Sequence, residues 1–97
     1  MTTVLSELAQ AFEVMLRCPE RVVYDGNCNL DLYDGSWHVQ IFMDCGDVDY
    51  VDHITFENET LDFDSPLVTA LTNYLAVPEV RDRVLSLARD CHNWDYR

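Results

Sequence analysis

The chain has 97 residues, of which 48% are hydrophobic, enough for one globular domain over residues 1–97. Its 18 acidic residues outnumber six basic ones, so the formal net charge is −12. That charge disfavours direct binding to nucleic acid or to an anionic membrane, because both require a basic surface. No apolar run reaches the roughly 20 residues of a membrane span, and the N-terminus resembles neither a signal peptide nor a transit peptide, so we expect a cytoplasmic protein.

The first segment predicts an amphipathic helix. Apolar residues recur with helical spacing from Val4 to Leu16, and Thr2 or Thr3 can cap the helix. Cys18-Pro19 ends it, because the residue before a proline resists helical geometry. The four cysteines of the chain include no CxxC pair and no secretory signal accompanies them, so we expect reduced thiols.

The middle of the chain alternates apolar and polar residues and predicts four antiparallel strands, at roughly 21–25, 28–33, 36–43 and 47–56. Two Asp-Gly pairs and one Cys-Gly pair mark the turns. Ser65-Pro66 and Pro78 then begin two amphipathic helices. The expected fold class is α+β: an N-terminal helix, a four-stranded antiparallel meander, and two C-terminal helices packed on one face of the sheet.

Hairpin register follows from the lengths of the turns. If Asp34-Gly35 is a two-residue loop, Asp31 lies opposite His38. If Cys45-Gly46 is another, Met43 pairs with Val48. Both turns then place the same apolar set on the inner face: Cys28, Leu30, Leu32, Trp37, Val39, Ile41, Met43, Val48, Tyr50, Ile54 and Phe56. The outer face carries Asn29, Asp31, Tyr33, His38, Gln40, Phe42, Asp49, Val51 and His53. Asp52 falls on the inner face, unless a β-bulge near Val51 rotates it outward.

Site motifs for metal binding or catalysis are sparse. In this register Asp31, His38 and His53 form a row across three strands, the composition of a two-His, one-carboxylate metal site. The segment "DCGDVDYVDHIT" does not match the ligand positions of an EF-hand loop. No glycine-rich phosphate loop, GxSxG or HExxH is present. We therefore expect no cofactor and no enzymatic activity. The candidates for metal binding are Asp31, His38 and His53, together with a looser cation site at the 44–47 turn.

The acidic residues suggest an interaction surface. All six basic residues are arginine, and none lies between Val22 and Val80, a span that holds twelve acidic residues. Carboxylates at i and i+2 on a strand are about 6.6–6.8 Å apart and can imitate successive phosphates. Aromatic residues among them can serve as apolar anchors. The expected partner-binding residues are Asp31, Tyr33, Asp34, Phe42, Asp44, Asp47, Asp49, Glu57, Glu59, Asp62 and Asp64.

The stretch "GSWHVQIFMDCGDVDYVD" resembles a family of small uncharacterised bacterial proteins that have a Trp-led strand followed by Asp-Cys and Asp-Tyr. This resemblance implies a bacterial or phage origin but no activity. In size, charge and α+β build the chain is also similar to anti-CRISPR proteins and other DNA-mimic inhibitors. That similarity involves no shared motif, so it assigns no role to any residue.

These observations favour a non-enzymatic acidic inhibitor in the cytoplasm of a bacterial host cell. It would occupy the basic nucleic-acid-binding surface of a defence nuclease or CRISPR ribonucleoprotein. One alternative is an immunity protein that neutralises a basic toxin. Another is a metal-binding or sensing domain built on Asp31, His38 and His53, and a third is a helical interaction module in the C-terminal segment "RDRVLSLARDCHNWDYR".

Overall fold

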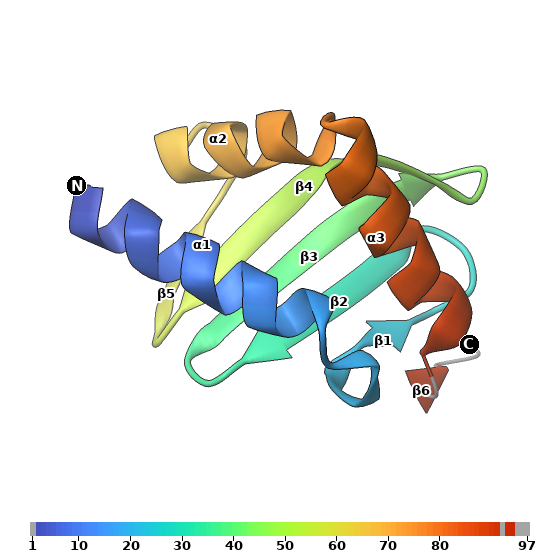
Figure 1. Cartoon of the computed structure of the whole chain (residues 1–97). Helices are drawn as coiled ribbons and strands as arrows, with labels where there is room; N and C mark the ends of the chain where they lie inside the picture. The colour runs from blue at the N-terminus through green and yellow to red at the C-terminus, as the bar shows by residue number, and fades with distance from the viewer. Residues whose placement is uncertain (1, 92, 95–97) are drawn as a thin grey trace.

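The computed structural model describes residues 2–91 and 93–94. Three helices cover one face of a six-stranded sheet (Figure 1). The elements in chain order are α1 (Thr2–Leu16), the 3-10 helix η1 (Pro19–Arg21), β1 (Val23–Tyr24), β2 (Asn29–Asp34), β3 (Trp37–Asp44), β4 (Asp47–Phe56), β5 (Glu59–Leu61), α2 (Pro66–Leu75), α3 (Pro78–Asp90) and β6 (Asn93–Trp94). The α+β class is confirmed. Among the described helices, none has the length and apolar character needed to cross a membrane.

The sheet is wider than the predicted meander. Its strand order is β5-β4-β3-β2-β1-β6, with β6 parallel to β1 and the other neighbours antiparallel. Strand β5 lacks an alternating apolar pattern because two of its three residues are Glu59 and Thr60. It forms by pairing with β4, where Thr55 lies opposite Thr60. Both added strands are short, and their sequences alone do not predict them.

The two central hairpins differ in how well the predicted register holds. Cys45 and Gly46 both have positive φ, as a two-residue turn of this type requires, and Met43 pairs with Val48 as predicted. In the first hairpin the loop is Gly35-Ser36 instead of Asp34-Gly35, so the predicted pairing of Asp31 with His38 is wrong. Gly35, at φ +56, takes the first loop position and Asp34 closes the ladder. The shift is two residues, so the side chains of β2 and β3 stay on their predicted faces.

Strand β4 contains two register shifts, and each leaves one aspartate without a partner on β3. The pairing passes over Asp49 and then over Asp52. Both aspartates are exposed, so the expected outward rotation of Asp52 by a bulge is confirmed. The shift at Asp49 was not expected, and it exchanges the predicted faces of the next two residues: Tyr50 is 40% exposed, whereas Val51 is 1% exposed.

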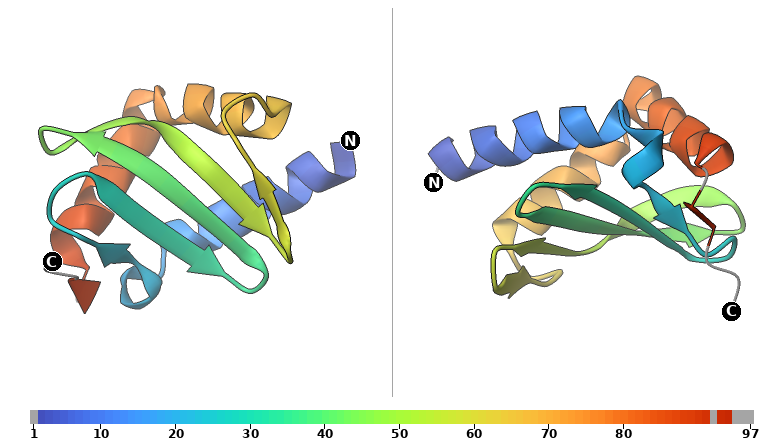
Figure 2. Two further views of the ribbon diagram at one scale, coloured as in Figure 1. Left: turned by 180° about the vertical axis from the view of Figure 1, so that it is seen from behind. Right: turned by 90° about the horizontal axis from the view of Figure 1, so that it is seen from below.

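The core lies between the sheet and the helices. Figure 2 shows α1, α2 and α3 on the same side of the sheet. Their buried residues include Leu8 and Phe12 of α1, Leu71 of α2 and Val84 of α3. Glu13 of α1 accepts two hydrogen bonds from the Arg83 guanidinium of α3, both 3.0 Å long. No disulfide bond joins the four cysteines, all of which lie within the described residues.

Candidate interaction surface

The face of the sheet opposite the helices is not covered by any described helix (Figure 2). We call this surface the open face. It is formed by residues of the three longest strands. On β2 and β3 these alternate with residues that are buried in the core, whereas on β4 the two register shifts interrupt the alternation. The members of the open face are Asp31, Tyr33, His38, Gln40, Phe42, Tyr50 and His53.

Asp31 is the main hydrogen-bond acceptor of the open face. Its Oδ1 lies 2.7 Å from Nε2 of His38 and accepts a 2.9 Å hydrogen bond from Nε2 of Gln40. The Asp31 side chain is only 18% exposed. This residue, one of those predicted to bind a partner, therefore holds the side chains of His38 and Gln40.

Aromatic rings occupy much of the remaining open face. Tyr33 stacks on His38 with ring centroids 4.5 Å apart, and His38 meets His53 edge-on at 5.5 Å. Burial, together with the negative charge of Asp31, raises the pKa of the Tyr33 hydroxyl. Phe42 stacks on Tyr50 at 5.2 Å. The predicted anchors Tyr33 and Phe42 therefore lie on one face, and Tyr50, which the predicted register placed in the core, joins them.

The predicted metal row does not assemble. Asp31 and His38 are hydrogen-bonded to each other, while Nδ1 of His53 lies 2.8 Å from Oδ2 of Asp52. Across the described residues, no group of three His, Cys, Asp or Glu side chains is placed to hold a metal ion. The predicted row required both hairpins to keep the expected register. His53 lies opposite Gln40 instead of His38, because the pairing of β4 passes over Asp49 and Asp52.

A polar hollow of about 400 Å³ lies at the β1–β2 side of the open face. Asp25, Asn27, Asn29 and Asp31 contribute to its lining. Oδ1 of Asp25 accepts hydrogen bonds from the backbone amides of residues 27, 28 and 29, at 2.8, 2.9 and 3.1 Å. Burial acts to raise the pKa of this carboxyl, but the backbone amides outweigh it and the pKa is lowered.

Exposed carboxylates surround the sheet at its turns and at the β5 edge. We call them the acidic rim: Asp44, Asp47, Asp49, Glu57, Glu59, Asp62 and Asp64. Asp47 lies 3.9 Å from Nε of Arg81, and the other six have no ion pair within the described residues. Asp34 was predicted to belong with them, but it accepts a 3.1 Å hydrogen bond from Arg21.

The acidic rim is divided into two ends. Asp44, Asp47 and Asp49 lie at the β3–β4 turn. Glu57 lies at the opposite end of the same hairpin, where its backbone amide donates to the carbonyl of Ser36. Strand β3 separates the two ends and has eight residues, or roughly 26 Å at the usual rise. Asp44, Asp47 and Asp49 thus lie at one end of the hairpin and Glu57 at the other, while Asp62 and Asp64 follow β5 in the loop before α2.

None of the described strands contains an arginine. The arginines within residues 2–91 lie on or beside α1, η1 and α3, and each is within 4.0 Å of a carboxylate: Arg17, Arg21, Arg81, Arg83 and Arg89. The segment of the sequence without basic residues thus corresponds to a spatial separation between the arginines and the sheet. The helical side holds ion pairs, whereas the sheet side presents carboxylates that have few cationic partners.

No protein family matches the chain, and no curated protein or solved structure is significantly similar to it. We therefore infer the partner surface and the class of target from the geometry and charge of the chain itself.

Proposed function

We propose that the chain is a non-enzymatic inhibitor that occupies a basic nucleic-acid-binding surface on another protein. The class of target we propose is a bacterial defence nuclease or CRISPR ribonucleoprotein. The observation that carries the proposal is the separation of charge: the described arginines lie on the helical side, while the acidic rim has only one long contact to an arginine. An acidic surface of this kind gains most from a partner rich in Arg and Lys.

The two ends of the acidic rim suit a partner that binds an extended anion. Their separation of roughly 26 Å corresponds to about eight base pairs of duplex DNA, at about 3.4 Å per step. The carboxylates would compete with phosphates for the same arginines and lysines, and long-range attraction would speed the encounter. Tyr33, Phe42 and Tyr50 supply ring surface between the two ends, where an interface needs apolar contact.

The experiment is a capture from bacterial lysate with three forms of the protein as bait. The rim variant carries Asp44→Asn, Asp49→Asn and Glu59→Gln. The control variant removes the same number of charges from the helical side, through Glu7→Gln, Glu79→Gln and Asp82→Asn. We expect wild type and control to retain a basic nucleic-acid-binding protein at low salt and release it at high salt, because screening shortens the reach of exposed charges.

The same capture separates the alternatives. A basic toxin on the column would identify an immunity protein that uses the same surface. Equal retention by all three baits would contradict a role for the acidic rim. The C-terminal helical module is less favoured, because Val80, Val84, Leu87 and Ala88 of α3 are buried in the core. Residues 92 and 95–97 of that segment lie outside the described residues.

A further inference from the structure

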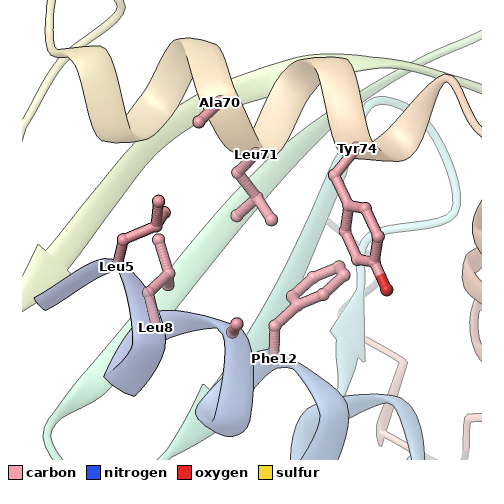
Figure 3. Close-up of a pocket in the computed structure, with 7 residues that line it drawn as sticks. Leu5, Leu8, Phe12, Ala70, Leu71 and Tyr74 are labelled. Atoms are coloured by element: carbon pink, nitrogen blue, oxygen red, sulfur yellow. The ribbon is translucent and has the colours of Figure 1, made fainter. Parts of the chain in front are cut away.

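A second surface, on the helical side, has the opposite character to the acidic rim. Leu5, Leu8 and Phe12 of α1 face Ala70, Leu71 and Tyr74 of α2 across an apolar groove of about 360 Å³ (Figure 3). Within the groove the rings of Phe12 and Tyr74 meet edge-on, with centroids 6.1 Å apart. Its floor is buried, but Leu5 is 43% and Tyr74 44% exposed. Apolar surface is thus left open to solvent along both walls.

The surroundings of this groove are almost free of charge. Residues 65–78, which include all of α2, contain no acidic or basic side chain, although 25% of the chain is charged. Helix α1 contributes only Glu7 and Glu13. Glu13 is paired with Arg17 and Arg83, and Glu7 lines a separate depression beside Asp34 and Trp37. We call the groove and its lining residues the neutral face.

We propose that the neutral face binds a second copy of the chain. Each copy has a formal net charge of −12, so most contacts between copies would oppose carboxylates and be repelled. At the neutral face two copies can bury apolar surface without opposing like charges. A basic partner would gain little there, because the residues that line the groove are all uncharged.

Two-fold pairing would use the same residues on both copies. The α1 and α2 helices of the two copies would form a four-helix layer between the two sheets, at the usual interaxial distance of 8–10 Å. Helix α1 has 15 residues and is about 22 Å long, so a face two helices wide offers roughly 400 Å² per copy. This area is at the weak end for specific interfaces. We therefore expect a dimer that dissociates on dilution.

Dimerisation goes beyond the proposed inhibitor function and has a distinct salt signature. Salt screens the repulsion between two acidic copies, so a higher salt concentration should strengthen the dimer. Binding of a basic partner at the acidic rim should instead weaken when the salt concentration is raised. A dimer would also present two acidic rims facing outward, which would increase the avidity for a target that has two basic sites.

The test is sedimentation velocity of the full chain over a concentration series, at about 0.05 M and about 0.5 M NaCl, where screening differs strongly. Ala9→Glu and Ala70→Glu each place a carboxylate at an exposed position in the groove, so two-fold pairing would bring like charges together. Thr69→Glu is the matched control, because it adds the same charge to an exposed position of α2 outside the groove lining. Circular dichroism checks that all variants remain folded.

We expect wild type and Thr69→Glu to dimerise as concentration rises, more strongly at high salt, and both groove variants to weaken the dimer at least tenfold. In NMR spectra, concentration-dependent shifts should map to residues 5–12 and 70–77. A monomer at every concentration and salt would overturn the proposal. A dimer unaffected by both groove variants, or equally disrupted by Thr69→Glu, would overturn it as well.

Discussion

His38 Nε2 lies 2.7 Å from Asp31 Oδ1, although the two residues are not opposite each other in the sheet. Asp31 faces Gln40 across the hairpin, and His38 faces Tyr33. The Asp31 carboxylate therefore holds the side chains of His38 and Gln40 on the neighbouring strand. The ring of Tyr33 stacks on His38 and is held through it. The open face is ordered by this polar network where no described helix covers it.

The first prediction concerns Asp31. Asp31→Ala removes the shared acceptor and should lower the free energy of unfolding by about 1–3 kcal/mol, because partly buried donors lose their partner. Asp31→Asn keeps an acceptor oxygen and should cost less. Urea denaturation measures both. Unchanged stability in Asp31→Ala would show that the network contributes nothing to the fold.

Asp25 should stabilise the β1–β2 turn and make the free energy of unfolding depend on pH in the acidic range. Its pKa is lowered from the ordinary value of 3.8, so its contribution is present above that pH and is lost as the pH falls through the folded-state value. Asp25→Ala should destabilise the protein by about 1–3 kcal/mol at pH 7, since three backbone amides lose their acceptor. The difference from wild type should shrink as the pH falls below 3.8 and through the lowered folded-state value. A difference that stays constant with pH would contradict the role of the carboxylate.

The ion pair between Glu13 and Arg83 should couple α1 to α3. A double-mutant cycle with Glu13→Gln and Arg83→Gln should give a coupling energy of about 0.5–1 kcal/mol, near the top of the range for exposed pairs because the geometry is bidentate. The hydrogen bonds from Arg83 lower the pKa of Glu13 from its ordinary 4.5. The coupling should therefore persist at neutral pH and disappear as the pH falls through the folded-state value. If the effects of the two single substitutions are additive, the ion pair contributes nothing to the free energy of unfolding.

Thr72 should support the irregular part of β4. Its Oγ1 accepts a 3.0 Å hydrogen bond from the backbone amide of Val51, which lies between the two bulges. Thr72→Val keeps the shape but removes the acceptor, and it should cost about 1–2 kcal/mol. Thr69→Val, on the exposed side of the same helix, is the control and should change stability by less than about 0.5 kcal/mol. Equal effects of the two substitutions would show that the hydrogen bond to Val51 is not needed.

Much of the fold follows from periodicity and turn chemistry. The helix before Cys18-Pro19, the helix after Ser65-Pro66 and the four central strands depend on local signals, which act over a few residues. Strand faces are predictable even when the register is not, because a shift of two residues preserves the alternation of side chains.

The candidate surface was less predictable, because it depends on contacts distant in sequence. The bulge at Asp49 brings Tyr50 to the open face, and nothing local in "DVDYVD" marks it. The partners of Asp34 and Glu13 come from η1 and α3, and the groove depends on the angle between α1 and α2. Periodicity within one segment contains no information about such contacts.

The central claim, that the acidic rim imitates nucleic acid, is tested most directly by displacement. Labelled DNA or RNA is bound to the basic partner obtained by capture, and the protein is titrated in while fluorescence anisotropy reports the bound nucleic acid. We predict displacement by wild type and by the Glu7, Glu79 and Asp82 control variant, and at least tenfold weaker displacement by the Asp44, Asp49 and Glu59 variant. A partner that binds the protein while retaining its nucleic acid would contradict the claim.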